Sequence, residues 1–288
     1  MSSIPVAHAA PDRFSNPSRA SALLKQFSPA APMAGVTPAT RLEIRPIPET
    51  VSSGILQIDA LTGGLPRGCL TEISGPDSSG RTSLLLAALA AATGRQETCA
   101  LIDVSDALDP HSAAAAGIRL ERLLWVRCGL NAPASPRQNP SRNEERSVEQ
   151  ALRAADLLLQ SGGFGLLALD LAGISGKTAR RVPLTTWFRF RRTIEHTSTL
   201  LLILTTQPCA QACASLSLQM KTDSSGARLQ ASAIRCQLSE NRSTEEHLPS
   251  HARLLEGLCI QAELLRNRAE CKPMQSVGAF TTKTSWTA

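Results

Sequence analysis

Residues 75–82 read Gly-Pro-Asp-Ser-Ser-Gly-Arg-Thr, the frame of a phosphate-binding loop, G-x-x-x-x-G-K-[ST], with arginine in place of the lysine. Leu70–Ile73 before the loop is typical of a short strand, and Ser83–Ala90 after it is typical of an apolar helix. A strand, a glycine-bounded loop and a helix in this order are the context that the motif requires. The stretch therefore predicts a P-loop at the N-terminus of a helix. The alternative is a glycine-bounded turn that matches by chance.

The residue types in the loop suit phosphate chemistry. Gly75 and Gly80 permit backbone angles that side chains forbid, so that successive N–H groups can converge on an anion. Arg81 keeps the positive charge as a planar fork, which favours bidentate phosphate binding and fits in-line phosphoryl transfer poorly. We therefore expect binding of a nucleoside triphosphate rather than its fast hydrolysis. The candidate phosphate-binding residues are Gly75, Ser78, Ser79, Gly80, Arg81, Thr82 and Ser83.

A second element of a nucleotide site follows at Leu166–Asp170, an apolar strand that ends in a carboxylate. In P-loop proteins this pattern places an aspartate near Mg²⁺ at the carboxyl edge of the sheet. Thr82 stands where a hydroxyl holds the same ion. Thr82 and Asp170 are therefore the candidate Mg²⁺ ligands.

Short apolar strands alternate with helices along most of the chain, which predicts an α/β fold with a mainly parallel sheet covered on both faces. Further strands are expected at Cys99–Val104, Leu123–Arg127, Leu166–Asp170 and Leu200–Thr205. Helices are expected at Ile55–Leu61, Thr82–Ala92, Pro110–Gly117, Val148–Ser161 and Leu184–Glu195. Antiparallel strands are expected at Arg228–Leu238 and Leu258–Arg266, and an exposed loop at residues 131–146.

Composition indicates one large domain with tails. The 288 residues, 42% of them hydrophobic, can bury one substantial core. Residues 1–40 are rich in Pro, Ser and Ala, and we expect a mobile segment with a short amphipathic stretch, Arg19–Phe27. Residues 41–280 are expected to form the nucleotide-binding core, and residues 281–288 a C-terminal tail.

The chain shows no sign of membrane association. No apolar run reaches membrane-spanning length, and residues 1–20 lack the apolar core of a secretory signal. The eight cysteines are thinly spread, as free thiols in a reducing compartment would be. We therefore expect a cytoplasmic protein. Cys209 and Cys213 are the only close cysteine pair, and without a second pair at ligand spacing no zinc site is expected.

The net charge of +6 is compatible with a polyanionic partner. Between residues 177 and 192, six basic residues are interleaved with Trp187, Phe188 and Phe190, a mixture that can follow a nucleic-acid backbone and stack bases. Helical spacing favours core packing for Trp187 and Ile194, with the arginines in solvent. The candidate contacts to single-stranded DNA are Lys177, Arg180, Arg181, Lys221 and Arg228.

Several motifs in order resemble the bacterial RecA recombinase family. The loop at 75–82 resembles that family's G-P-E-S-S-G-K-T, and residues 99–110, Cys-Ala-Leu-Ile-Asp-Val-Ser-Asp-Ala-Leu-Asp-Pro, resemble its C-A-F-I-D-A-E-H-A-L-D-P. Residues 51–68, 149–170 and 198–204 are similar to further family segments, and Lys25-Gln26-Phe27 to the arm through which family members assemble. The resemblance spans roughly residues 20–240. It implies a RecA-like P-loop fold, ATP and Mg²⁺ as cofactors, single-stranded DNA as partner, and self-assembly into filaments.

The departures from the family pattern concern catalysis. Ser105 stands where the family has the glutamate that activates the attacking water, and a hydroxyl is too weakly basic for that role. Asp106 is adjacent, but on a strand one position usually means the opposite face. Ser112 replaces the tyrosine that stacks on adenine, while Asp109 remains available to the base. The family's nucleotide-sensing glutamine corresponds to Thr206, with Gln207 one position late.

The regions that the resemblance assigns to DNA contact also differ. The first DNA-binding loop looks shortened to residues 175–181, and the second is expected within Pro208–Arg228. A long loop of this kind is commonly functional or disordered.

Three functions are compatible with the sequence. The favoured one is a RecA-like DNA repair or recombination protein that binds ATP and single-stranded DNA with weak or absent hydrolysis. The second is a non-catalytic accessory of damage-induced (SOS) mutagenesis, similar to the ImuA family, that acts through partners such as a translesion polymerase. The third is a competent ATP-driven recombinase in which Arg81 and Asp106 substitute successfully.

Overall fold

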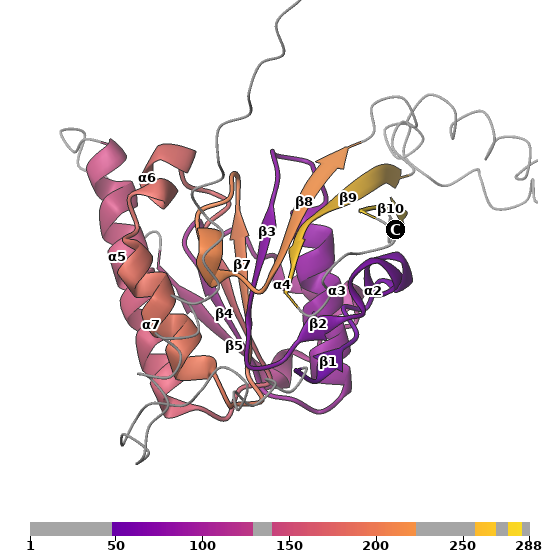
Figure 1. Ribbon diagram of the computed structural model, residues 1–288, viewed down its shortest axis with the longest axis horizontal. Coiled ribbons are helices and arrows are strands. Elements are labelled where there is room, and N and C mark those ends of the chain that lie inside the picture. Colours follow the sequence, from indigo (N-terminus) through magenta and orange to yellow (C-terminus); the bar gives the residue numbers. More distant parts are fainter. Residues whose placement is uncertain (1–47, 129–139, 223–256, 269–275, 284–288) are drawn as a thin grey trace, which may run out of the picture. The chain divides into compact units, whose positions relative to one another are not determined.

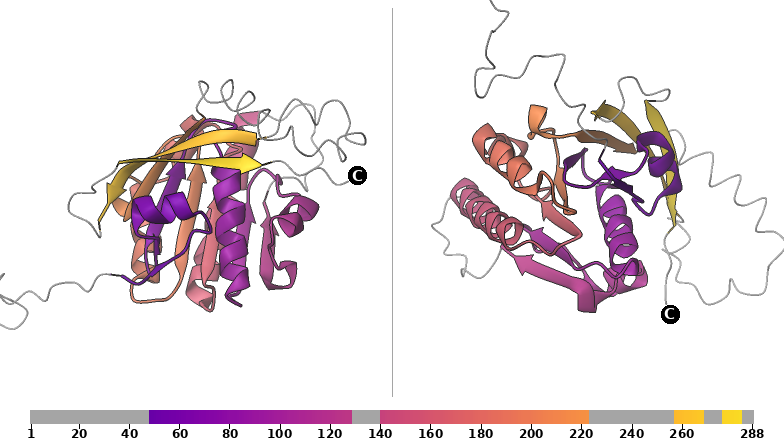
Figure 2. Two further views of the ribbon diagram at one scale, coloured as in Figure 1. Left: turned by 90° about the vertical axis from the view of Figure 1, so that its right-hand side faces the viewer. Right: turned by 60° about the horizontal axis from the view of Figure 1, so that its bottom comes forward.

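The computed structural model describes residues 48–128, 140–222, 257–268 and 276–283. These residues form an eight-stranded sheet with helices on both faces (Figure 1, Figure 2). In spatial order the strands are β10 (Val277–Lys283), β9 (Gly257–Asn267), β8 (Leu216–Thr222), β3 (Leu70–Ser74), β7 (Leu200–Thr205), β6 (Leu166–Asp170), β4 (Cys99–Asp103) and β5 (Leu123–Arg127). A separate short ladder pairs β1 (Thr50–Val51) with β2 (Leu65–Pro66).

The six strands from β8 to β5 are mutually parallel, while β9 runs antiparallel to β8 and β10 antiparallel to β9. The predicted fold class, a mainly parallel α/β sheet with antiparallel strands at the C-terminal edge, is confirmed. The expected strand Leu258–Arg266 lies within β9. The expected strand Arg228–Leu238, the N-terminal segment 1–40 and its candidate arm lie outside the described residues.

The two faces of the sheet carry different helices (Figure 2). One face packs against α2 (Leu56–Thr62), α3 (Arg81–Gly94) and α4 (Pro110–Ala115), and the other against α5 (Pro140–Ser161), α6 (Gly176–Arg180) and α7 (Leu184–Ile194). Single turns of 3₁₀ helix occur at η2 (Leu120–Arg122) and η3 (Gln211–Cys213). Because every residue of β3, β4 and β7 is buried, these strands lack the polar alternation of a one-sided sheet.

Helix α7 settles the two interpretations of the basic and aromatic stretch. Trp187 and Phe190 are fully buried and meet edge to face, with ring centroids 6.0 Å apart. Ile194 is also buried, whereas Arg189 stays near the surface and pairs with Asp156 of α5 at 3.1 Å. Core packing is therefore confirmed for Trp187 and Ile194.

The expectation of an exposed loop over residues 131–146 is wrong for its second half, because α5 begins at Pro140. Proline suits the first turn of a helix, where its missing N–H needs no partner. The polar residues that follow contact α6: Glu144 accepts hydrogen bonds from the Ser175 and Thr178 hydroxyls, both at 2.9 Å. These tertiary contacts extend the helix through a stretch whose composition suggests a loop.

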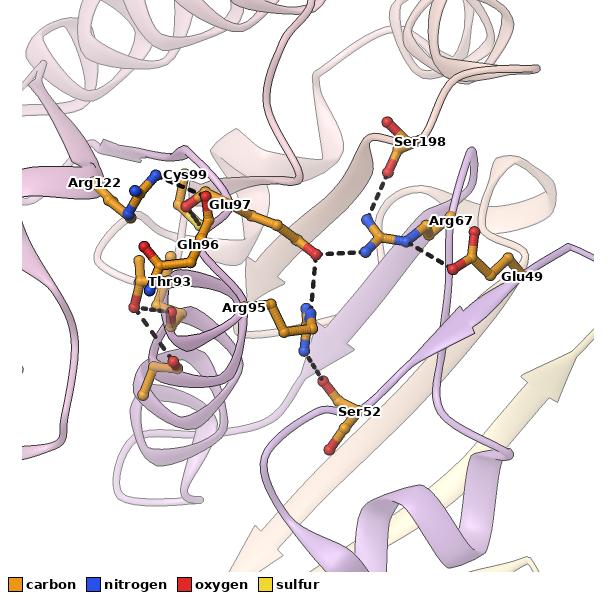
Figure 3. A network of polar contacts seen from close by, with 12 residues as sticks. Glu49, Ser52, Arg67, Thr93, Arg95, Gln96, Glu97, Cys99, Arg122 and Ser198 are labelled. Atoms are coloured by element: carbon orange, nitrogen blue, oxygen red, sulfur yellow. Dashed lines mark hydrogen bonds and ion pairs between the residues drawn. The ribbon is translucent and has the colours of Figure 1, made fainter.

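The amino-terminal edge of the sheet is held by an ion-pair network (Figure 3). Glu97 accepts hydrogen bonds on Oε1 from Arg67 at 2.5 Å and Arg95 at 2.9 Å. Arg67 also donates to the Ser198 carbonyl at 2.9 Å, and it lies 3.7 Å from Glu49. Burial alone would raise the pKa of Glu97, but the two guanidinium groups outweigh it and lower that pKa. The network ties the segment before β3 to the starts of β4 and β7.

Helices of the described ranges are all too short or too polar to cross a membrane. The six cysteines in these ranges, Cys69, Cys99, Cys128, Cys209, Cys213 and Cys259, are free thiols. Within the same ranges no cluster of three His, Cys, Asp or Glu side chains could hold a metal ion.

Candidate functional site

The loop between β3 and α3 adopts a conformation that its glycines make accessible. Ser78 and Gly80 both have left-handed φ angles, 60° and 87°. A Cβ on Gly80 would lie 2.1 Å from the Ile260 side chain of β9, and one on Gly75 would lie 2.5 Å from the Met220 carbonyl of β8. Glycine is therefore required at both positions. At Gly80 the reasons are the left-handed φ angle and the close packing, and at Gly75 the reason is the close packing.

The antiparallel edge of the sheet supports the loop from outside. The Thr222 hydroxyl, at the end of β8, donates to the Ser78 carbonyl at 2.5 Å. Together with the Ile260–Gly80 contact, this hydrogen bond fixes the outer side of the loop against β8 and β9. The loop is thus held on two sides, by β3 before it in the chain and by β8 and β9.

Polar groups at the loop remain without partners among the described residues. The Ser79 hydroxyl, in a residue only 1% exposed, makes no hydrogen bond, nor does the buried Thr205 hydroxyl at the end of β7. Helix α3 begins at the N-cap Gly80 without a side-chain cap. The first N–H groups of a helix have no intrahelical acceptor, so the start of α3 suits an anion. These residues fit a phosphate group.

Arg81, predicted to hold phosphate, contacts the end of β7 and Asp77 of the loop. It is 7% exposed, and its Nη1 donates to the Thr205 carbonyl at 2.8 Å. Its Nη2 donates to Oδ1 of Asp77, within the same loop, at 3.0 Å. In this arrangement the guanidinium already has a carboxylate and a carbonyl as partners.

Asp170 ends β6 beside Asp103 of β4, its direct partner in the parallel register. Burial is the main cause that raises the pKa of Asp170 to about 6, and the neighbouring Asp103 carboxylate adds to it. The Ala172 N–H, which donates to Asp170 Oδ1 at 2.8 Å, and the charge of Arg81 act in the opposite direction. A buried carboxylate within electrostatic reach of the P-loop residue Arg81 is chemically suited to Mg²⁺, and Asp170 fits the role predicted for it.

Ser105 lies in a crowded position. Its N–H and hydroxyl donate to Asp103 Oδ1 at 3.1 and 3.4 Å. A Cβ added to Gly173 would lie 2.3 Å from the Ser105 Cβ, so the backbone after β6 packs directly on this side chain. The position that carries the water-activating glutamate in the RecA family therefore holds a weak base and little free space.

Asp106, the alternative base, is engaged elsewhere. Both of its carboxylate oxygens accept hydrogen bonds from Arg127 at the end of β5. That guanidinium lies over the Trp125 ring, 4.8 Å from its centroid, and lowers the pKa of Asp106. The carboxylate is thus an ion-pair partner on the edge strand.

Asp109 caps helix α4. Its carboxylate accepts hydrogen bonds from the backbone N–H groups of His111 at 3.3 Å and Ser112 at 2.9 Å, and from the Ser112 hydroxyl at 2.6 Å. The Ser112 hydroxyl is the main cause that lowers the pKa of Asp109. Both residues that were expected near a nucleotide base are therefore partners in an N-cap.

Of the candidate DNA contacts, three lie on or next to α6. Lys177 and Arg180 are exposed on this helix, and Arg181, at its C-cap, pairs with Glu145 of α5. Gly176 at the start of the helix lies beside Thr206 and Gln207, with the Thr206 hydroxyl 3.4 Å from where a Cβ would stand. The first residue of α6 is thus next to the residues that follow β7.

The second predicted DNA loop, Pro208–Arg228, is not a continuous loop. Residues 216–222 form β8, where Lys221 pairs with Glu263 of β9 at 2.7 Å. Leu216, Leu218 and Met220 alternate along this strand and are buried, and this alternation is the signal that identifies it. Arg228 lies outside the described residues.

The connection between β7 and β8 is short and held in place. Buried Glu72 of β3 accepts hydrogen bonds from the backbone N–H groups of Cys209 at 2.6 Å and Ala210 at 2.9 Å. From the other side, Arg266 and Arg268 donate to the carbonyls of Gln211 and Ala212. Residues 209–212 of this connection are therefore held from both sides.

Four residues of the site were absent from the sequence-based set: Asp77, Asp103, Gly173 and Thr205. The i,i+4 spacing of Asp77 and Arg81 is the only local signal among them. Asp103, Gly173 and Thr205 reach the site through strand register and close approach across the sheet, which no local pattern reports.

Comparison with known proteins agrees with the geometry. Residues 40–179 match the family model of the RecA N-terminal domain. The chain is 37% identical to Protein RecA of Ectopseudomonas oleovorans over 124 residues, which is 42% of this chain and 31% of that protein. It is also 37% identical to the RecA proteins of Teredinibacter turnerae, over 44% of this chain and 33% of that protein, and of Rickettsia bellii, over 42% and 31%. The match thus spans about a third of the length of these curated relatives.

The raised pKa of Asp170 predicts a specific pH dependence of stability. Between pH 4 and pH 6 the unfolded chain loses this proton while the folded protein retains it, so the folded state loses stability as pH rises through this window. Relative to Asp170→Asn, the wild type should lose about 2 kcal/mol of unfolding free energy from pH 4 to pH 6, and less than about 0.5 kcal/mol more above it. Urea unfolding in EDTA, repeated across this range, measures the difference. Parallel curves for the two proteins would contradict it.

Proposed function

Because this chain is a relative of the RecA family, we propose that it acts in DNA repair or recombination as a nucleotide-binding protein that hydrolyses ATP weakly or not at all. One observation carries the proposal. The backbone of the P-loop is shaped for an anion, while Asp103, Asp106 and Asp109 are already engaged by other groups. The site can thus hold a phosphate chain without a free base to activate water.

Each part of the site has a role in this proposal. The N–H groups of residues 78–83 and the Ser79 hydroxyl would bind phosphate oxygens, and Thr82 and Asp170 would hold Mg²⁺. Bound Mg²⁺ would neutralise part of the negative charge of the phosphates. Ser105 and Asp106 leave the attacking water without a general base, which separates binding from turnover.

Binding is tested first by thermal unfolding. At a concentration of ATP and Mg²⁺ a hundred times the dissociation constant, we expect the melting temperature to rise by about 5–10 °C. Gly80→Ala should abolish this rise, because a Cβ there meets Ile260 and the residue needs a left-handed φ. Gly94→Ala, at the open end of the same helix, is the matched control and should keep it. An unchanged melting temperature of the wild type would overturn nucleotide binding.

Turnover is tested separately with radiolabelled ATP. We expect phosphate release at background level, with or without single-stranded DNA, in the wild type. Ser105→Glu should stay within about twofold of that level, because Gly173 leaves little space for a longer side chain to reach a water. DNA-stimulated release by the wild type would instead support a competent recombinase.

A second candidate function is a non-catalytic accessory of translesion mutagenesis that acts through protein partners. The observation that favours it is the β7–β8 connection, which Glu72, Arg266 and Arg268 hold in place where the RecA family resemblance predicts a DNA-binding loop. In this case the chain would bind nucleotide but contact DNA weakly. Self-assembly into filaments, expected from the arm at residues 25–27, belongs to the first candidate.

Titration of single-stranded DNA binding against salt separates the two candidates. For the first candidate, the logarithm of the DNA-binding constant falls linearly with the logarithm of the salt concentration. We expect the magnitude of this slope to decrease by about 1.4 when both Lys177 and Arg180 are replaced by Ala, since each lost phosphate contact contributes about 0.7. Arg119→Ala, exposed before the start of β5, should leave the slope nearly unchanged. Absence of measurable DNA binding together with a nucleotide-induced melting shift would favour the accessory function.

A further inference from the structure

The Arg81 side chain connects the P-loop residue Asp77 to the end of β7. The Thr205 carbonyl accepts two hydrogen bonds, one from Arg81 Nη1 at 2.8 Å and one from the Gly75 N–H at 3.2 Å. The guanidinium therefore lies where β3 and β7 end side by side. Its other end reaches Asp77, whose side chain is 93% exposed. The Arg81 guanidinium therefore links the buried end of β7 at Thr205 to the exposed Asp77 of the loop.

An arginine suits this double contact. The planar guanidinium presents its N–H donors in a fixed fork, so Nη1 can donate to the carbonyl while Nη2 donates to the carboxylate. The hydrogen bond to Asp77 is charge-assisted, as a bond to a ligand phosphate would be. The Asp77 carboxylate thus occupies the Arg81 donor that a second phosphate group would use.

We propose that Asp77 is an internal competitor for ligand phosphate, which retains Arg81 until a di- or triphosphate displaces it and thereby determines how strongly the site prefers polyphosphates. This inference rests on the proposed nucleotide binding. A single phosphate is held by the N–H groups at the start of α3 and leaves the Asp77–Arg81 pair intact. An adjacent second phosphate must replace Asp77 as the partner of the guanidinium. The free energy needed to break the Asp77–Arg81 pair therefore lowers the affinity of the site for a di- or triphosphate.

The size of the effect follows from the exposure of the pair. Because the Asp77 carboxylate is almost fully exposed, its attraction to Arg81 and its repulsion of phosphate are both screened by water and salt. Removing its charge should therefore strengthen binding of nucleoside di- and triphosphates by about 3- to 10-fold at low ionic strength. Nucleoside monophosphate affinity should change by less than about twofold.

The test is calorimetric titration of the full chain with AMP, ADP and a nonhydrolysable ATP analogue, with Mg²⁺. Asp77→Asn removes the charge and keeps the size of the side chain, while Asp77→Glu keeps the charge. Glu121→Gln, an exposed carboxylate in η2 before the start of β5, controls for net charge. We expect Asp77→Asn alone to bind the two polyphosphate ligands more tightly, and the gain to fade in 0.5 M salt.

Each other result overturns the proposal in a distinguishable way. Equal or weaker polyphosphate affinity in Asp77→Asn, with the wild type binding normally, would refute competition by Asp77 and leave the proposed nucleotide binding intact. An equal gain for AMP would show that Asp77 acts on all anions and does not determine preference. Absence of binding in the wild type and in every variant would overturn the proposed function and this inference together.

Discussion

The parallel register of four central strands is the constraint on which the site depends. Strands β3, β7, β6 and β4 pair residue by residue, so Ser74, Thr205, Asp170 and Asp103 end at one edge of the sheet. The P-loop leaves β3 at this edge, and its arginine binds back to the end of β7. Hydrophobic burial of the strands on both faces therefore positions these four strand-end residues.

At this edge the carboxylates are arranged for structure more than for proton transfer. Asp103 binds N–H groups of the chain that follows β4, Asp106 binds an edge arginine, and Asp109 caps a helix. Each interaction holds the carboxylate in a fixed direction. Asp170 differs, because burial makes its charge costly until a cation is close.

Much of the fold could be predicted from local sequence, because buried parallel strands are apolar throughout and are bounded by polar or glycine residues. The ranges of β5 and β6 were predicted to the residue, as was β7, Leu200–Thr205. Strand β8 was missed because the family resemblance assigned its residues to a loop, although Leu216, Leu218 and Met220 alternate clearly. The start of α5 was missed because its support comes from α6.

The P-loop frame was evident in the sequence, whereas the partners of its arginine were not. Contacts such as Arg81 with Thr205 join residues 124 positions apart, and only the strand order brings them together. The same holds for Gly173 and Ser105, whose close approach needs β4 and β6 to be neighbours. Residue type predicted the loop and its candidate ligands, and tertiary packing decided which of its side chains already have partners.

The hydrogen bond from Thr222 to Ser78, with Ile260 packed on Gly80, makes the outer strands part of the mechanics of the loop. Thermodynamic coupling between two events is reciprocal. If a ligand stabilises this loop conformation through these contacts, it stabilises the β8–β9 pair by the same coupling free energy. Separation of these strands from the loop would then weaken binding of that ligand by the same amount. The P-loop and the antiparallel strands are thus linked through these two contacts.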